Sequence, residues 1–252
     1  MTDKEEKWEQ LKKKNPWQKE IFNEDTDKLL QEILSEKTKF IHSSDKLGDE
    51  SKYKLFLLPK PYRGNLKDPK LVILSLNPGY KERVKRIMFK MLSTKYQKQF
   101  IEVSKANALL EDGCRIISDK YDVDDVLDNG YWKKQLYDLE HEKMIDSSKI
   151  GLIQYVPYAS EKYDSKDNDD NLGTQKFTTE IIHYLLNETD TLFLVMRSKE
   201  RWENLIGGKK VNINKERFLY NKNPRCQKLS RKNLKNGDLD QYEEILKKFK
   251  GK

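Results

Sequence analysis

The sequence predicts an α/β protein: a three-layer sandwich in which helices flank a mainly parallel, four-stranded central sheet. Two observations carry this prediction. Apolar runs of strand length recur along the chain, and each is nearly continuous, as is typical of strands buried on both faces. Between these runs, apolar residues recur at helical spacing, so strands and helices alternate in the way that builds a parallel sheet.

Four segments are predicted to form the sheet. The clearest is the run 71–76, Leu-Val-Ile-Leu-Ser-Leu, and the others are 150–156, 191–196 and the weaker 217–220. Each is apolar, too short for a typical helix and bounded by polar residues, which favours a strand. All four lie within residues 51–252, which we therefore interpret as the α/β domain.

Helical periodicity fills the gaps between the strands. The stripe after the first strand comprises Val84, Ile87, Met88, Met91 and Leu92, and we interpret its methionines as core packing. Further stripes predict helices that include Phe177–Leu185, Trp202–Leu205 and Tyr242–Phe249. Residues 95–149 are too many for one crossover, so we expect a helical insertion there.

Residues 1–50 are predicted to form a charged helical arm in front of the domain. An apolar stripe at helical spacing follows a capping residue at Asp25 or Thr26. Trp8, Trp17 and Phe22 are the apolar anchors expected to dock this arm onto the body. The sequence leaves open whether the arm also contacts DNA or a protein partner.

Composition excludes several classes of protein. No run of about 18 apolar residues is present among the 252, so a transmembrane span is not expected. Two cysteines, Cys114 and Cys226, and three histidines are too few for a Cys-rich zinc site or an iron–sulfur cluster. We expect reduced thiols in a cytoplasmic, monomeric protein without metal or other cofactor.

Positive charge is concentrated near the end of the chain. The whole sequence has a net charge of +8, whereas residues 197–252 contain 17 Lys/Arg and 7 Asp/Glu, a net +10. Such a segment indicates a polyanionic partner such as DNA. The alternative interpretation is a lysine-rich surface that only promotes solubility.

Short polar segments follow each predicted strand, and ligands of open α/β sheets bind at the carboxyl ends of the strands. These segments are residues 77–80, 157–160, 197–200 and 223–226. The first and last of them begin with an Asn-Pro turn. Either turn alone is ordinary loop chemistry, but the pair at matching strand ends points to one site.

The two Asn-Pro segments carry a resemblance to a known family. Leu76-Asn77-Pro78-Gly79, directly after an apolar strand, resembles the first motif of the uracil-DNA glycosylase superfamily, in its mismatch-specific and single-strand-selective branches. Asn223-Pro224-Arg225-Cys226-Gln227-Lys228-Leu229-Ser230-Arg231 resembles its second motif, a loop that inserts into the duplex. The lead-in at 59–64 is compatible with the same superfamily, and the order of elements agrees from about residue 55 to 249.

The resemblance implies a monofunctional DNA glycosylase that flips uracil or another altered base out of DNA and hydrolyses its N-glycosidic bond without a cofactor. The implied catalytic residues are Asn77, which positions water, and Asn223, which steadies the departing base. The implied base pocket comprises Pro78, Gly79, Tyr80 and Gln154, with Tyr80 stacking on the base. The implied DNA contacts are Arg225, Lys228, Leu229, Ser230 and Arg231, with Leu229 as the wedge that fills the vacated stack.

Several roles and functions stay open at this point. Leu229 could instead pack its loop onto the core, and Tyr80 could be a half-buried aromatic residue at a helix start. Arg225 and Gln154 depart from the family pattern, which favours a glycosylase for a hypermodified base, for example in viral DNA. A catalytically inactive nucleic-acid-binding protein and a small-molecule enzyme on the same scaffold are also compatible with the sequence.

Overall fold

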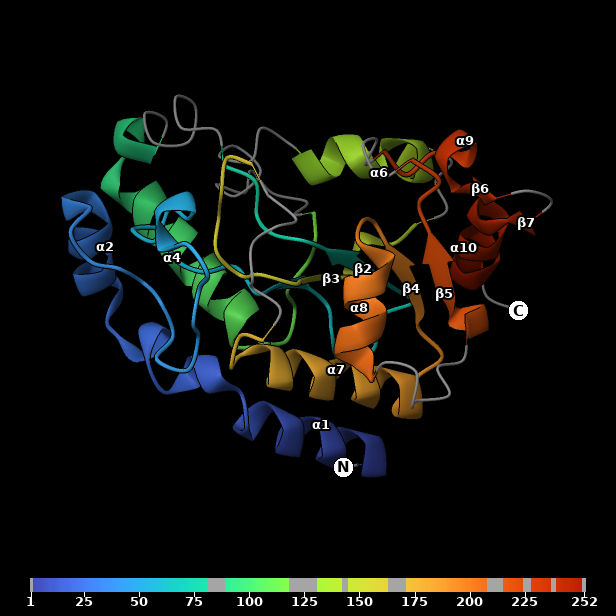
Figure 1. The fold of residues 1–252 in the computed structure, drawn as a ribbon, viewed down its shortest axis with the longest axis horizontal. Helices are drawn as coiled ribbons and strands as arrows, with labels where there is room; N and C mark the ends of the chain where they lie inside the picture. Colours follow the sequence, from blue (N-terminus) through green and yellow to red (C-terminus); the bar gives the residue numbers. More distant parts are fainter. Residues whose placement is uncertain are drawn as a thin grey trace.

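A mixed sheet lies at the centre of the molecule in the computed structural model, which describes residues 2–80, 89–117, 131–141, 145–162, 171–207, 215–223, 228–236 and 239–250. In this described part, the sheet has five strands in the order β1-β3-β2-β4-β5. The strands are β1 (Tyr62–Gly64), β2 (Leu71–Ser75), β3 (Ile150–Gln154), β4 (Leu192–Val195) and β5 (Phe218–Tyr220). Figure 1 shows the sheet between layers of helices.

The four predicted strands correspond to β2, β3, β4 and β5, and all neighbouring pairs among them are parallel. The prediction of a mainly parallel four-stranded sheet is corrected by β1, which pairs antiparallel with β3 at the edge and makes the sheet mixed. At three residues β1 is too short to show a periodicity. It ends at Gly64, whose positive φ of 77° and close approach to the Ile150 carbonyl exclude a side chain.

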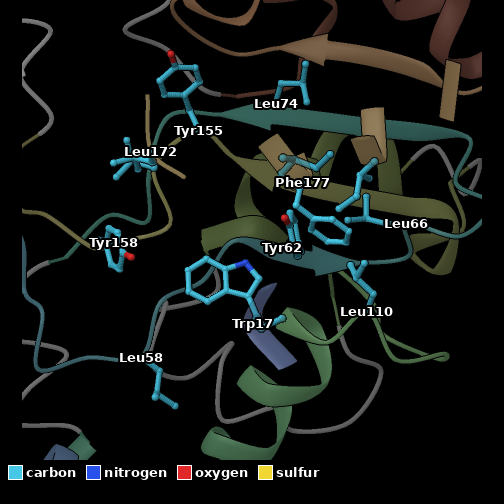
Figure 2. Packing of buried hydrophobic residues seen from close by; sticks show 14 of the residues in the cluster. Trp17, Leu58, Tyr62, Leu66, Leu74, Leu110, Tyr155, Tyr158, Leu172 and Phe177 are labelled. Atoms are coloured by element: carbon cyan, nitrogen blue, oxygen red, sulfur yellow. The ribbon is translucent and has the colours of Figure 1, made fainter. Parts of the chain in front are cut away.

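The first face of the sheet is covered by α7 (Gln175–Glu188) and by the amino-terminal region. This region contains α1 (Asp3–Lys13), the short helices η1 (Pro16–Gln18) and η2 (Ile21–Asn23), and α2 (Thr26–Ser35). Of the two predicted capping residues, Asp25 is the one that caps α2. The side chains of Trp8, Trp17 and Phe22 are buried in the same hydrophobic cluster as the sheet, which confirms that they dock the arm. Figure 2 shows the Trp17 indole reaching toward Tyr62 of β1.

The second face is covered by α6 (Tyr131–His141), α9 (Arg231–Leu234) and α10 (Gln241–Lys250). The predicted insertion therefore contributes to both faces, because α4 (Thr94–Ala108) packs with α2 and β1 on the first face. A two-stranded ribbon, β6 (Lys235–Asn236) with β7 (Leu239–Asp240), links α9 to α10.

The remaining helices connect the strands. The helix α8 (Lys199–Ile206) follows β4, and η3 (Glu50–Lys52), η4 (Ser147–Lys149) and η6 (Lys215–Arg217) are single 3₁₀ turns before strands β1, β3 and β5. The start of the predicted methionine stripe, residues 84–88, lies outside the described residues. Within its described end, Leu92 packs against the core, whereas Met91 is 79% exposed, which corrects its interpretation as core packing. In the described part of the chain, no helix is both long enough and apolar enough to cross a membrane.

Candidate functional site

The strand order creates a ligand-binding position at one end of the sheet. The chain leaves β2 toward β3 on one side, and after β3 it crosses to β4 on the other side of β2. Ligands of open α/β sheets bind where the direction of the connections reverses, outside the carboxyl ends of the strands. We call this end of the sheet the carboxyl edge and the opposite end the amino edge. Three of the predicted site residues, Asn77, Gln154 and Asn223, follow or end strands at the carboxyl edge.

Asn77, two residues beyond β2, has its side-chain amide fixed by the protein. Its Nδ2 donates to Ser160 Oγ at 2.7 Å, and lies 3.3 Å from the backbone oxygens of Pro78 and Tyr158. Carbonyl oxygens only accept hydrogen bonds, so the nitrogen of the amide must face them. The Oδ1 of Asn77, which no described residue contacts by a hydrogen bond, therefore faces away from this anchor. A half-buried acceptor held in this way can orient a water molecule or a ligand N–H.

Ser160 is a site residue that the motif analysis missed. It bridges to the Asn77 turn with its backbone as well as its side chain, because Ser160 N–H donates to the Pro78 carbonyl at 3.1 Å. In return, Tyr80 N–H donates to the Ser160 carbonyl at 2.9 Å. The 157–160 segment was recognised as a strand end, but nothing in its sequence indicated that its serine would hold Asn77.

A buried carboxylate from the amino-terminal region supports this loop. Asp45, only 6% exposed, accepts hydrogen bonds from the Tyr158 hydroxyl at 2.7 Å, from Thr174 N–H at 2.8 Å and from Thr174 Oγ1 at 3.0 Å. The Tyr158 hydroxyl also accepts the backbone N–H of His42 at 3.0 Å. Burial, and then the Asp45 charge, raise the pKa of Tyr158 well above its ordinary value, so the phenol remains a donor. Residues 42–45 thus hold the residue whose carbonyl anchors Asn77.

A row of polar side chains crosses the carboxyl edge on the second face. Alternation along the strands places Gln154 of β3 and Ser75 of β2, which are register partners, on the same face as the buried Leu152. Asn221, just after β5, reaches the same face, where its Nδ2 lies 3.8 Å from Met196 Sδ. The side chain of Gln154 is buried, and its Oε1 has no hydrogen-bond partner within the described residues.

An orphaned acceptor of this kind costs roughly 1–3 kcal/mol unless something donates to it. A donor that reached Gln154 Oε1 would recover this cost. That Gln154 lines a base pocket stays a prediction.

Tyr80 is not placed as the resemblance implies. Its side chain is 2% exposed, and its ring packs edge-on against Phe56 with centroids 6.2 Å apart. The expectation that Tyr80 stacks on an extruded base is therefore corrected: the ring is covered where the chain turns after Gly79. Of the predicted pocket residues, Pro78 is also buried, whereas Gly79 is exposed.

Asn223 lies beyond β5, two strands away from β2, which corresponds to about 10 Å between the strand axes. Its backbone N–H donates to Asn233 Oδ1 at 3.2 Å, and Asn233 Nδ2 donates to the Lys228 carbonyl at 3.0 Å. Asn233, which sequence reasoning missed, thus ties together the two ends of the second Asn-Pro loop. The intervening residues 224–227, including Arg225, lie outside the described part of the chain.

Leu229 is buried in the core rather than exposed as a wedge. Its side chain is 0% exposed in the cluster on the second face, and its N–H donates to the Gln135 carbonyl of α6 at 3.1 Å. The wedge expectation is corrected, and the packing alternative describes its position. The reason is that Leu229 packs in the same cluster as Trp132 and Leu136 of α6, which the Leu-Ser motif could not indicate.

The neighbours of Leu229 differ in how accessible they are. Lys228 is exposed, whereas the Ser230 carbonyl accepts the N–H groups of Asn233 and Leu234 at the start of α9. Arg231 is half-exposed but forms ion pairs with Asp240, at 2.7 Å, and with Glu243. Two carboxylates therefore offset the charge of Arg231, which makes it a weak candidate for phosphate binding.

The basic carboxyl-terminal segment is divided between the two edges of the sheet. Lys199, Lys222 and Lys228 are exposed near the carboxyl edge. The last turn of α10 reaches the amino edge, since Lys248 pairs with Asp190 before β4, and the Phe249 carbonyl accepts from Lys70 before β2. The net charge of +10 in residues 197–252 is therefore larger than the positive charge that lies near either end of the sheet.

A cavity of about 190 Å³ lies at the amino edge, away from the candidate site. Its lining includes Trp8, Asn65, Leu110, Cys114 and Lys149. In the ranges that the structure describes, no group of three or more His, Cys, Asp or Glu side chains could hold a metal ion. Comparisons with protein-family models, with curated proteins and with solved structures found no match, so the family resemblance rests on the motif residues.

Proposed function

We propose that the protein is a monofunctional DNA glycosylase that accepts an altered base at the carboxyl edge and hydrolyses its N-glycosidic bond. The observation that carries the proposal is the anchored amide of Asn77 beside the 157–160 loop. Its Nδ2 is held by Ser160 and two carbonyl oxygens, so Oδ1 is the atom offered to the site. The similarity of the two Asn-Pro segments to the uracil-DNA glycosylase motifs adds the reaction type.

The chemistry fits the residues at this edge. Cleavage of the bond develops positive charge on the sugar and negative charge on the base, so the reaction needs a positioned water and donors toward the base. Asn77 Oδ1 can accept a hydrogen bond from that water and orient it, although an amide is not a general base. The rate would then come from positioning and from stabilisation of the leaving base.

Gln154 supports a base as the ligand. Its amide offers an acceptor and a donor in one plane, and its buried Oε1 has no donor from the described residues. A base edge with adjacent N–H and C=O groups, such as that of uracil, matches both atoms. Ser75 in the neighbouring position is a second hydrogen-bonding group for the same ligand.

The surroundings of this edge suit a polyanion. The exposed side chains of Lys222 and Lys228 lie near the end of β5, where the DNA that leads to an extruded nucleotide would pass. Lys199, after β4, is exposed as well but forms an ion pair with Glu203 at 3.7 Å. Phosphate contacts of this kind supply sequence-independent affinity that falls steeply with salt.

The test is a gel assay of strand cleavage by alkali after incubation with oligonucleotides that carry a panel of modified bases. Wild type should give an abasic product with at least one base, and Asn77→Ala should lose most of that rate while binding DNA normally. Ser160→Ala, which frees the Asn77 amide, should give an intermediate loss. Absence of product from every base would contradict the glycosylase proposal.

A second candidate function, nucleic-acid binding without catalysis, is favoured by one observation. Tyr80 and Leu229, which the resemblance assigns to stacking and wedging, are both buried in this structure. Salt-sensitive DNA binding without product from any base would favour this function. A glycosylase for a hypermodified base would instead give product only with the bulky members of the panel.

A further inference from the structure

The segment 157–160, which anchors Asn77, has two hydrogen-bonded edges. Along one edge, the carbonyl oxygens on either side of Tyr158 accept backbone N–H groups of the 54–60 segment at 2.8 and 2.9 Å. The Tyr158 carbonyl between them faces the other edge, where it lies 3.3 Å from Asn77 Nδ2. Two hydrogen bonds along one line define an axis, so this pairing alone leaves the segment able to rotate and to carry the Tyr158 carbonyl away from Asn77.

The side chain of Tyr158 opposes this rotation because it is fixed at its far end. It is 1% exposed within the hydrophobic cluster on the first face, part of which Figure 2 shows. Its hydroxyl donates to Asp45 Oδ2 at 2.7 Å and accepts the His42 N–H at 3.0 Å. Since a side chain leaves the backbone roughly at right angles to the chain direction, the hydroxyl is a third fixed point away from the axis.

Residues 42–45 are in turn held against the residues that lead into α7. Asp45 accepts both the N–H and the hydroxyl of Thr174. Gly173 approaches Ser44 so closely that a Cβ on Gly173 would lie 2.4 Å from Ser44 Cβ and 2.5 Å from its carbonyl oxygen. Neither atom is the end of a flexible side chain, so this contact requires glycine at position 173. Residues 42–45 are therefore clamped between Tyr158 and the start of α7.

We propose that Tyr158 is a positioning residue of the candidate site, through which the amino-terminal region sets the direction of the Asn77 amide. The phenol holds the Tyr158 carbonyl in place, and this carbonyl helps to keep Asn77 Nδ2 turned toward the loop, so that Oδ1 faces the site. The inference rests on the proposed function for the reaction that Asn77 serves. It also gives residues 42–45 a role in catalysis that is separate from DNA binding.

The first experiment follows the Asn77 side-chain amide and needs no activity. In nitrogen–proton correlation spectra of isotope-labelled protein, the amide pair of Asn77 is identified as the pair that Asn77→Ala lacks. Tyr158→Phe removes the hydroxyl and keeps the ring. Loss of a hydrogen bond to a charged acceptor predicts that exchange of this amide pair with solvent rises about 10- to 150-fold. Gly173→Ala, which displaces residues 42–45, should shift the same resonances.

The second experiment compares the single-turnover rate of base release with the Kd for the same DNA. A displacement of about 1 Å at a positioning group can lower a rate about 100-fold, so Tyr158→Phe should lower the rate of base release about 10- to 100-fold. The Kd should stay within about twofold of wild type, because the change affects the reacting geometry rather than the DNA contacts.

Tyr62→Phe is the matched control. Tyr62 is also buried, at 2% exposure, and its hydroxyl lies 3.2 Å from Thr178 Oγ1 on the first face. The variant loses a phenol hydroxyl from the same cluster, so it reports what such a loss does to the protein in general. It should keep the Asn77 resonances and the rate of wild type. Urea unfolding checks that each variant is folded, and Gly173→Ala decides if Tyr158→Phe is not.

The two proposals fail separately. Unchanged Asn77 resonances and exchange in Tyr158→Phe and Gly173→Ala would overturn the positioning role, while product from wild type would keep the glycosylase proposal. An equal loss of rate in Tyr62→Phe would also overturn the positioning role, because the effect would then be one of general stability. Faster exchange in Tyr158→Phe, together with no product from any modified base, would support the link between Tyr158 and Asn77 and overturn the glycosylase proposal.

Discussion

Replacement of the buried carboxylate in Asp45→Ala tests the link between the amino-terminal region and the site. The substitution removes the acceptor of three hydrogen bonds, one from Tyr158 and two from Thr174. Both donor residues are nearly inaccessible, with 1% and 3% of their surface exposed. Water therefore cannot replace the carboxylate without further rearrangement.

The expected cost follows from this count. A buried donor left without an acceptor costs about 1–3 kcal/mol, and removal of the Asp45 charge recovers part of its desolvation penalty. We expect a loss of about 3–5 kcal/mol in the free energy of unfolding. With an m-value of about 2.5–3 kcal/mol/M for a domain of this size, the urea midpoint should fall by about 1–2 M. Asp45→Asn, which keeps one acceptor oxygen, should lose about 1–2 kcal/mol.

Urea unfolding followed by circular dichroism measures these midpoints. Asp68→Ala is the matched control, because Asp68 is 56% exposed and forms an ion pair with Lys4 at the surface. Its loss should stay below about 1 kcal/mol. If Asp45→Ala unfolded at the same urea concentration as Asp68→Ala, the argument that Asp45 organises Tyr158 and Thr174 would be refuted.

Three further predictions concern the core, a thiol and the charged edges. Leu229→Ala should lower the free energy of unfolding by about 2–5 kcal/mol because the side chain is buried. An unchanged urea midpoint would contradict the packing role of Leu229 and favour its role as a wedge. Burial raises the pKa of the Cys114 thiol to about 11. In Cys226→Ser protein, labelling of Cys114 by a thiol reagent should therefore rise about tenfold per pH unit from pH 7 to 10. At pH 8, native protein should be labelled much more slowly than protein unfolded in urea. Equal labelling rates in native and unfolded protein would contradict this burial. Lys222→Glu should weaken DNA binding about tenfold at low salt, whereas Lys250→Glu at the amino edge should not, and equal effects would mean that the edges are not distinct.

The strands of the fold could be predicted from the sequence because their burial on both faces leaves an uninterrupted apolar run. The segment 71–76 shows this most clearly, and it contains β2 at the centre of the sheet. The edge strand β1 could not be predicted in this way, since its three residues include a buried arginine, Arg63, between Tyr62 and Gly64. That residues 62–64 form a strand is apparent only from their antiparallel pairing with β3.

The rule that ligands bind beyond strand ends selected Asn77, whereas Gln154 was expected at the site only because of the family resemblance. The residues that hold the site were not predictable from local patterns. Asp45 and Asn233 look like solvated loop residues in the sequence, yet both are buried and joined to partners outside their own turns. The same limit explains why the sequence left two roles open for Leu229, because its burial depends on α6, almost a hundred residues earlier.

The domain organisation shows a similar dependence on distant contacts. The sequence of residues 1–50 predicted a charged arm in front of the domain that a few apolar side chains dock onto the body. These side chains are buried with the sheet, and Asp45, whose role was not predicted, reaches the loop that anchors Asn77. Sparse anchors in a charged segment were therefore enough to make it part of the core.

The most direct test of the central claim is mass spectrometry of the products that wild type and Asn77→Ala form from oligonucleotides with modified bases. The account predicts a free base together with an intact strand that carries one abasic site, formed by wild type and largely absent with Asn77→Ala. Equal amounts of free base from both proteins, or none from wild type with any base, would contradict it.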